Sequence, residues 1–516
     1  MMYGAPDLVV DSVTGVDVSL SVAGPGARAY AFTVDWLIRT VVAIAWFVVS
    51  ACIYNGRWSL LQPLSPNAAW FICVVTPPAV IYFLYHPVLE LAMNGRTPGK
   101  RVAGVRLVTR EAGIPGIGPV LIRNVFRIVD SFPLVYGVGL LAVTATRDNV
   151  RIGDIAAGTV LVYDRGAGPM GAQSLKEELP AALLQLRARW KAAASRTRRL
   201  TGSQARDAED AARMADDYRL LAHDLARVRR LIPGSQTREY LESAYAGAHA
   251  TIHRPGRSIA AALLSLFRDQ IPEVVTQLRG FIFWSTTIFL LTVAAGYGMI
   301  RLYPALIALF ASPELIAAVQ KGQLWTEGLL NVVPSSVLSV QILANNVVVS
   351  LFAYCAGFLF GLGTFYILGL NGLMLGAVFA FTGLHGLDGN LFRFIVAHGL
   401  VETSVMCLSG AAGAAVGEAL IRPKTQRRSE SFRIAALQSG KLLVACVLLL
   451  IGSGLIEGYV SPDPDVPFWA RIAIGVAYWL FMIALLRGWL FRFFWPSGGP
   501  RTAQGRLAPT TPHVPQ

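Results

Sequence analysis

Long apolar segments alternate with polar connections over most of the 516-residue chain. Many of these segments approach 20 residues with few charged side chains, the length that an α-helix needs to cross a bilayer. The pattern predicts an all-α fold, a polytopic integral membrane helical bundle of about eight spans. We place the spans at about 29–54, 68–93, 280–300, 342–368, 370–385, 391–421, 437–460 and 469–490.

One further apolar stretch, residues 119–145, is interrupted by charge. It contains Arg123, Arg127 and Asp130, and Pro133 follows them. Charged groups are costly in the middle of a spanning helix, and proline breaks a helix. We therefore expect a re-entrant or interfacial element here and not a single crossing of the membrane.

Two regions outside the spans have patterns of their own. Residues 9–20 are rich in β-branched residues and are broken by Thr14 and Gly15, which predicts a small hairpin. In the polar block that follows residue 165, apolar residues recur at spacings of four and three, which predicts packed cytosolic helices. The positions of this helical seam are Met214, Tyr218, Leu221, Leu225, Val228 and Ile232.

These patterns divide the chain into five parts. We expect a short β-like leader, a first membrane domain, a cytosolic basic helical region, a second membrane domain and a disordered tail. Their boundaries are 1–27, 28–165, 166–278, 279–495 and 496–516.

The composition excludes a purely soluble protein and a disordered chain. Hydrophobic residues make up 54% of the chain and charged residues 15%, whereas soluble domains average about 25% charged residues. The formal net charge is +14, from 45 Lys and Arg against 31 Asp and Glu. In a membrane protein such an excess indicates cytoplasmic loops beside anionic lipid headgroups. No nucleic-acid recognition motif accompanies it, so we expect no nucleic-acid partner.

The distribution of Lys and Arg predicts the orientation. The connection after the second segment and residues 422–433 are rich in both, whereas residues 461–468 contain Asp463 and Asp465 but neither Lys nor Arg. Cytoplasmic loops carry the excess of Lys and Arg. Both termini are therefore predicted to be cytoplasmic, in a bacterial inner membrane, provided that residues 119–145 do not cross.

Several ionisable residues lie within or beside the first apolar segments. Asp35 and Arg39 are four residues apart, and Arg28 precedes Asp35 by two turns, so the three share one helix face. Asp130 closely follows Arg127. Because each such group costs about 2.5–3.5 kcal/mol at mid-helix, it must be paired or functional. Two interpretations stay open: structural ion pairs near the cytoplasmic interface, or a cation or proton path lined by Asp35 and Asp130.

The C-terminal half contains a second group of ionisable residues. His398 and Glu402 are four residues apart on one predicted helix, and Glu457 lies near the end of the next. A buried hydrogen-bonded brace and a proton-handling or ligand-binding pair are both consistent with this spacing. A metal would need at least one further ligand, for which the sequence gives no clear origin. We therefore predict no metal site.

Glycine patterns complete this half. Gly369, Asn371, Gly372 and Gly376 mark a predicted sharp turn between two apolar segments, where we favour tight packing over backbone carbonyls exposed to a cavity.

The chain contains no Walker, G-x-S-x-G, H-E-x-x-H or dinucleotide-binding motif. We predict no catalytic residues and no cofactor.

Residues 28–165 resemble the RDD family of bacterial membrane proteins, named for an arginine and two aspartates. The resemblance implies roles for Arg28, for Asp35 and for either Asp130 or Asp154, of which Asp130 is favoured. For some members a transport role, including sodium–proton exchange, has been suggested. The matching stretches are ARAYAFTVDWLIR (27–39), GRTPGKRVAGVRLV (95–108), LIRNVFRIVDSFP (121–133) and RIGDIAAGTVLV (151–162).

Residues from about 175 to 490 resemble the stage II sporulation protein M family. The matching stretches are DDYRLLAHDLARVR (216–229), NNVVVSLFAYCAGFLFGLGTFYILGLNGLMLG (345–376), AHGLVETSVMCLSGAAG (397–413) and LIEGYVSP (455–462). A member of this family is the membrane subunit of a complex that remodels peptidoglycan, and its partners are the hydrolases. The resemblance gives weight to Asn346, Asn371, His398, Glu402 and Glu457.

Together these observations predict a non-enzymatic multi-pass inner-membrane protein that assembles or anchors an envelope-associated complex. Its expected partners are an anionic bilayer and proteins in the membrane or at its cytosolic face. The alternative is a secondary transporter or a sodium–proton exchanger that uses Asp35, Asp130, His398 and Glu402. An intramembrane enzyme that uses His398 and Glu402 is the least favoured interpretation.

Overall fold

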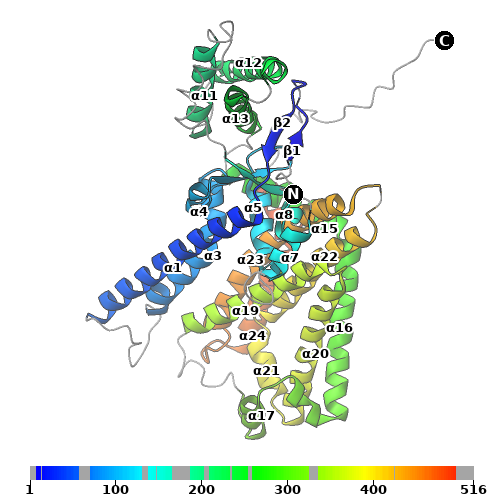
Figure 1. The fold of residues 1–516 in the computed structure, drawn as a ribbon. Coiled ribbons are helices and arrows are strands. Elements are labelled where there is room, and N and C mark those ends of the chain that lie inside the picture. The colour runs from blue at the N-terminus through cyan, green and yellow to red at the C-terminus, as the bar shows by residue number, and fades with distance from the viewer. Residues whose placement is uncertain are drawn as a thin grey trace, which may run out of the picture.

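The computed structural model shows a helical membrane bundle with a smaller helical module at one end (Figure 1). The all-α prediction is thereby confirmed. The tail beyond residue 495, predicted to be disordered, lies outside the described residues. The structure describes residues 7–12, 14–56, 70–130, 137–146, 148–164, 186–202, 208–232, 235–253, 259–324, 335–423 and 425–494.

Within the described residues, six helices are long and apolar enough to cross a membrane. Two of the eight predicted spans contain only shorter apolar helices among the residues that the structure describes: Val80–Ala92 within α3 (Thr76–Ala92), and Leu343–Phe358, which begins within α19 (Ser335–Cys355). The second predicted segment is divided between α3 and the π-helix η1 (Phe71–Val75). The count of eight was therefore too high. The six are α1 (Pro25–Asn55), α16 (Arg279–Leu302), α20 (Leu362–Leu384), α22 (Gly399–Ile421), α23 (Arg428–Tyr459) and α24 (Phe468–Leu486).

The predicted turn at Gly369–Gly376 is wrong, because these residues lie inside α20. The chain breaks earlier, at the 3₁₀-helix η4 (Ala356–Phe358) and at Gly361, whose φ of 82° favours glycine. Gly372 and Gly376 instead face α16, where an added Cβ would overlap Thr292 and the Val293 carbonyl oxygen. Tight helix packing, the favoured use of these glycines, is what the structure contains.

Residues 391–421 form two helices where one was predicted. The short helix α21 (Asp388–Ile395) ends before His398, and α22 begins at Gly399. Two short helices, η3 (Pro304–Leu309) and α17 (Pro313–Gln320), lie in the connection between α16 and α19.

Where the structure describes residues 117–157, they form four short helices. They are α5 (Ile117–Val125), α6 (Arg127–Asp130), α7 (Gly137–Ala145) and α8 (Ile152–Ala157). None is among the helices long enough to span, which agrees with the expected re-entrant or interfacial element. Through these helices the two membrane regions share one hydrophobic core, in which Ala156 of α8 lies in the same cluster as Phe432 and Ala436 of α23.

The predicted N-terminal hairpin is present. Strand β1 (Asp7–Val10) pairs antiparallel with β2 (Val18–Ser21), and Gly15 in the turn has a φ of 73°. A second antiparallel ribbon, β3 (Val105–Thr109) with β4 (Thr159–Tyr163), was not predicted. An isolated bridge from Val22 to Val162 connects the two ribbons.

Three helices form the polar module: α11 (Arg187–Gly202), α12 (Ala208–Leu231) and α13 (Gln236–Ile252). The predicted seam of α12 is buried in their core from Met214 to Val228, and Ile232 packs against its edge. The N-terminal hairpin completes this core, since Ser12 Oγ lies 2.6 Å from Tyr218 OH and Thr14 Oγ1 lies 2.6 Å from Tyr245 OH. The remaining helices are α4 (Pro98–Val102), α14 (Ile259–Ser265), η2 (Leu266–Gln270), α15 (Ile271–Gln277) and α25 (Trp489–Phe494).

Helices α1 and α3 pack against each other and project from the rest of the bundle (Figure 1). Large apolar side chains on both remain accessible, including Ile53 at 75% and Phe83 at 74%. So much exposed apolar surface on helices of this kind is compatible only with surroundings of lipid or of other membrane helices. The protein is therefore a multi-pass membrane protein.

Candidate functional site

Three candidate residues of the N-terminal half, Arg28, Asp130 and Asp154, lie in a buried cluster of charges, which we call the charge network. Its members are Arg28, Glu90, Lys100, Arg123, Asp130, Arg151 and Asp154. At the centre of the charge network lies Glu90 of α3, which is fully buried. Its Oε1 accepts from Lys100 Nζ at 2.5 Å and from Arg123 Nη1 at 2.5 Å, and its Oε2 accepts from Asn124 Nδ2 at 3.2 Å.

Asp154, in the first turn of α8, is the second carboxylate of the network. It accepts from Arg123 Nε at 2.6 Å and from Arg28 Nη1 at 2.8 Å. Burial alone would raise the pKa of Asp154, but the charges of Arg123, Arg28 and Arg151 outweigh it and hold the pKa well below its usual range. Arg123 therefore connects two buried carboxylates that come from different helices.

Asp130 has a different environment. It is fully buried, and its ion pair is with Arg151, whose Nε lies 3.4 Å from Asp130 Oδ2. Burial is the main cause that raises the pKa of Asp130 above its usual value, and the nearby charge of Asp154 adds to it. Arg28 pairs with Asp154, and no ion pair joins it to Asp130 among the described residues.

Asp35 is held by the N-terminal end of α4, where Thr97 is the N-cap and Gly99 lies in the first turn. Its Oδ2 accepts from Thr97 Oγ1 at 2.5 Å, and its Oδ1 accepts from the Gly99 backbone N–H at 2.8 Å. Tyr85 OH donates to the same carboxylate at 3.0 Å. A Cβ on Gly99 would overlap the Ala31 carbonyl oxygen. Residues 97–100 therefore bind the Asp35 carboxylate through the Thr97 side chain and the Gly99 backbone. Only glycine fits at position 99 without overlap.

Arg39 does not pair with Asp35, although the two are four residues apart on α1. Its guanidinium instead lies over the Tyr82 ring, 4.1 Å from the ring centroid, and Nη2 donates to Tyr82 OH at 3.3 Å. The sequence interpretation also missed Glu90, whose only signal was a lone carboxylate near the end of an apolar segment. The observed pairs support the structural interpretation of these charges.

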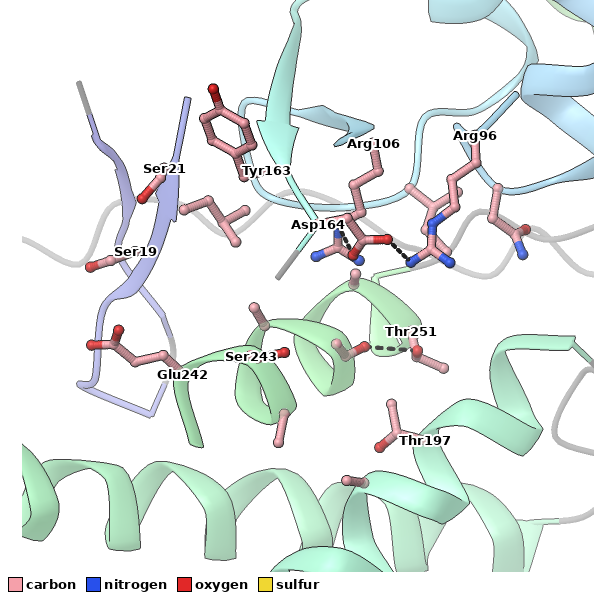
Figure 2. Close-up of a pocket in the computed structure, with 18 of the residues that line it drawn as sticks. Ser19, Ser21, Arg96, Arg106, Tyr163, Asp164, Thr197, Glu242, Ser243 and Thr251 are labelled. Carbon is pink, nitrogen blue, oxygen red and sulfur yellow. Dashed lines mark hydrogen bonds and ion pairs between the residues drawn. The ribbon is translucent and has the colours of Figure 1, made fainter. Parts of the chain in front are cut away.

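A polar cavity of about 540 Å³ lies between the N-terminal hairpin, the β3–β4 ribbon and α13 of the polar module (Figure 2). Arg96 and Arg106 reach it from one side, and Arg96 Nη2 pairs with Asp164 Oδ2 at 2.5 Å. Glu242 lines it from the module. The sequence interpretation did not predict this cavity, because its walls come from three separate regions.

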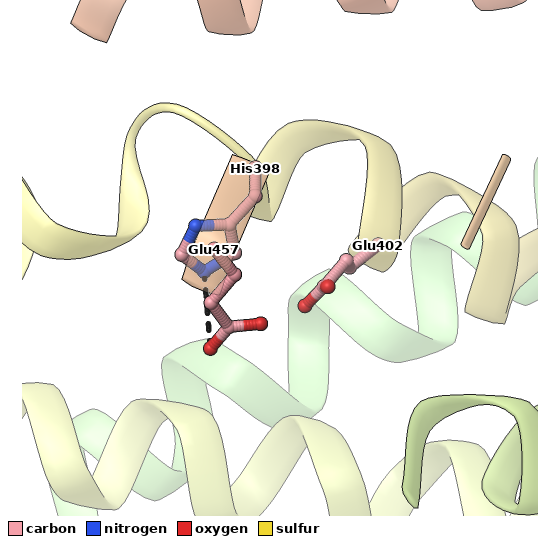
Figure 3. A group of neighbouring side chains, drawn as sticks. All are labelled: His398, Glu402 and Glu457. Atoms are coloured by element: carbon pink, nitrogen blue, oxygen red, sulfur yellow. Dashed lines mark ion pairs between the residues drawn. The ribbon is translucent and has the colours of Figure 1, made fainter. Parts of the chain in front are cut away.

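The candidate residues of the C-terminal half form a separate site. His398 immediately precedes α22, Glu402 lies in the first turn of α22, and Glu457 lies near the end of α23. One ligand atom from each lies within 4.8 Å of the others. His398 Nε2 is 3.6 Å from Glu457 Oε1, and the two carboxylates point toward each other (Figure 3). We call this group the His–Glu–Glu cluster.

Hydrogen bonding in the His–Glu–Glu cluster is incomplete. Glu402 Oε1 and Glu457 Oε2 are buried without a hydrogen-bond partner among the described residues. His398 Nδ1, by contrast, is satisfied by Ser461 Oγ at 2.9 Å. Within the described chain, neither glutamate forms an ion pair with Lys or Arg. The cluster thus has two carboxylates, and the one basic side chain beside them in the described chain is His398, which is charged only when protonated.

A smaller cavity, of about 220 Å³, borders the cluster. Glu402, Asn346, Ser350 and Asn371 supply its polar lining. Asn371 Nδ2 donates to the Ile367 carbonyl oxygen at 2.8 Å, which leaves its side-chain oxygen for other contacts. The structure therefore brings all five C-terminal candidates to one place, although they come from four segments of the chain.

Comparison with known families agrees with the two resemblances, except that the match to the second family begins at residue 281 and not at about 175. The RDD family model matches residues 22–158, and the model of stage II sporulation protein M matches residues 281–462. The chain therefore joins an RDD-family region to a stage II sporulation protein M-family region. The polar module has its own match, at residues 183–254, to a domain of unknown function. Searches of curated proteins and of solved structures gave no significant match.

Proposed function

We propose that the protein is a non-enzymatic component of a bacterial inner-membrane complex, which it assembles or anchors at the cell envelope. The observation that carries this proposal is the charge network, in which three buried carboxylates are each paired with at least one of four basic side chains. Arg123 connects Glu90 of α3 with Asp154 of α8. A network of paired charges fixes helices in position and leaves little free charge for a transported ion.

The connection between the two membrane regions supports the same proposal. Helix α8, which contains Asp154 of the charge network, packs against α23 in the shared core. Arg433 of α23 lies directly against Gly158 at the end of α8. The RDD-family region and the C-terminal bundle thus form one packed unit, a suitable base on which partners could assemble.

The polar module provides the surface for such partners. One face of α12 is buried in the module, and the opposite face carries exposed charged residues. We propose that this face docks on a soluble protein and that basic connections beside the module contact anionic lipid headgroups. The proposal requires that the module and both termini lie in the cytoplasm. The exposed residues are Asp216, Arg219, His223, Arg227 and Arg230.

Affinity capture after chemical cross-linking tests the proposal. The full chain should return a fixed set of partners in constant ratio, and the double change Arg219→Glu and Arg227→Glu should remove the soluble one. The matched control is Lys321→Glu, an exposed charge that follows α17 at the other end of the molecule. A chain that returns no constant partner would overturn the proposal.

A secondary transporter or ion exchanger is the second candidate. The observation that favours it is the cavity of about 220 Å³ beside Glu402, with Asn346 and Asn371 in its wall. In proteoliposomes, Glu402→Gln should then abolish ion-driven flux while the variant still elutes as a folded protein. Absence of flux with sodium, potassium or proton gradients would remove this candidate.

A further inference from the structure

The His–Glu–Glu cluster has the composition and the shape of a metal site. Imidazole nitrogen and carboxylate oxygen are both ligands of Zn²⁺, whereas Mg²⁺ and Ca²⁺ prefer oxygen alone. The three ligand atoms lie within 4.8 Å of one another and point to a common centre. We propose that His398, Glu402 and Glu457 bind a divalent transition-metal ion, with Zn²⁺ as the best fit. This proposal is independent of the assembly role.

The charge of the cluster supports a divalent ion. His398 and Glu457 are 3% and 8% exposed, and Glu457 Oε2 has no hydrogen-bond partner in the described part of the chain. A buried carboxylate without a partner is costly. Two carboxylates carry a formal charge of −2 when both are ionised, which one divalent cation neutralises. A proton shared between the two glutamates is the competing explanation.

The histidine is already oriented for binding. His398 Nδ1 is hydrogen-bonded to Ser461 Oγ at 2.9 Å, and His398 Nε2 faces Glu457. When Nδ1–H donates to Ser461, the lone pair of Nε2 is available to a metal. A second residue that fixes the ring in this manner is typical of metal-binding histidines. Ser461 follows α23 and is itself buried, so the orientation is set by packed structure.

Three protein ligands leave a coordination position open. Zinc sites with three protein ligands bind water or an exchangeable ligand at the fourth position. Glu402 also lines the cavity of about 220 Å³, where Asn346 and Ser350 offer further polar groups. The open position would therefore face a space that holds water or a small ligand, in contrast to a closed structural zinc site.

The test uses the full chain without a polyhistidine tag, purified in detergent and stripped with a chelator. Titration with Co²⁺ should produce visible absorption bands of a low-symmetry site, and Zn²⁺ should displace them. After gel filtration, elemental analysis should find one Zn²⁺ per chain. If the stripped wild type takes up neither ion, the proposal is wrong and the shared proton is the better explanation.

Variants then locate the ion. His398→Gln and Glu457→Gln should each weaken Co²⁺ binding by far more than about tenfold, and Ser461→Ala should weaken it by about 10–100-fold. Two matched controls should bind as wild type does: His385→Gln, whose ring contacts the Phe381 carbonyl oxygen, and Glu418→Gln at the far end of α22.

Glu402→Gln distinguishes loss of metal binding from loss of folding, because Glu402 is less buried than the other two ligands and its change should disturb the fold least. It should elute as wild type does, lose Co²⁺ binding and lose the rise in melting temperature that Zn²⁺ gives the wild type. Uptake that survives in His398→Gln and Glu457→Gln would overturn the assignment even if the wild type binds metal.

Discussion

The charge network and the His–Glu–Glu cluster both bury ionisable groups, yet they differ in charge balance. In the charge network, Glu90 and Asp154 each accept from two basic side chains. In the cluster, Glu402 and Glu457 face each other with a single histidine beside them. Buried charge alone therefore does not indicate function. An unbalanced group is the one that still requires a ligand or a proton.

The largest effect should follow from breaking the charge network at its centre. Arg123→Gln leaves Glu90 and Asp154 buried without their shared cation, so the free energy of unfolding should fall by about 3–5 kcal/mol. Denaturant titration in detergent measures it. The control Arg422→Gln removes an exposed arginine that pairs with Glu418 and should change stability by less than about 1 kcal/mol. Equal effects of the two changes would contradict the comparison.

The two aspartates of the network should respond to pH in opposite directions. The folded pKa of Asp154 is lowered, so its contribution is present above the unfolded pKa, about 3.9, and is lost as pH falls through the folded value. Asp154→Asn should cost about 3 kcal/mol at pH 7.

The folded pKa of Asp130 is raised, so its contribution is present below the unfolded pKa and is lost as pH rises through the folded value. Asp130→Asn should therefore be neutral or stabilising at pH 7, and this advantage should disappear in acid. Melting temperatures of both variants between pH 4 and pH 8 test the contrast. A destabilised Asp130→Asn at neutral pH would show that its pair with Arg151 dominates.

A smaller loss of stability should follow from Gly99→Ala, which tests how closely Gly99 packs against Asp35. The added methyl group would overlap the Ala31 carbonyl oxygen and the Asp35 side chain, so stability should fall by about 1–3 kcal/mol. The control is Gly118→Ala in α5, where an added Cβ meets nothing within 4 Å. If both alanine variants melt together, close packing at Gly99 is not important.

The smallest effect should come from the His–Glu–Glu cluster, and it should be a gain in stability. In chelator-stripped protein, Glu457→Gln removes one of two buried carboxylates that face each other, and stability should rise by about 1 kcal/mol. The same denaturant titration measures it. A loss of several kcal/mol would mean that the cluster is a structural brace, as the charge network is.

The sequence was most informative where a local period reports burial. The seam from Met214 to Val228 and the hairpin turn at Gly15 were both predicted, because spacing and turn chemistry are local properties. The strands Val105–Thr109 and Thr159–Tyr163 carried a similar signal in their β-branched residues. They were missed because apolar spans dominated the interpretation of this half.

Pairing between distant residues was much harder to predict. The spacing of His398 and Glu402 indicated one site, but Glu457 reaches it from another helix, and the residues alone gave no contact for it. Glu90 acquires its partners from α4 and α5, which no period in α3 reveals. Glycine stripes were ambiguous too, since Gly372 and Gly376 indicate a turn and a close helix contact equally well.

The N-terminal hairpin has a consequence for the order of events during synthesis. Ser12 and Thr14 bond to Tyr218 and Tyr245, which follow them by 206 and 231 residues. At about 5–20 residues per second on a ribosome, the hairpin is made roughly 10–40 s before its partners exist. Throughout that interval the inner face of β2, with Val18 and Leu20, has no module to cover it. The hairpin is therefore made well before the module that completes its contacts.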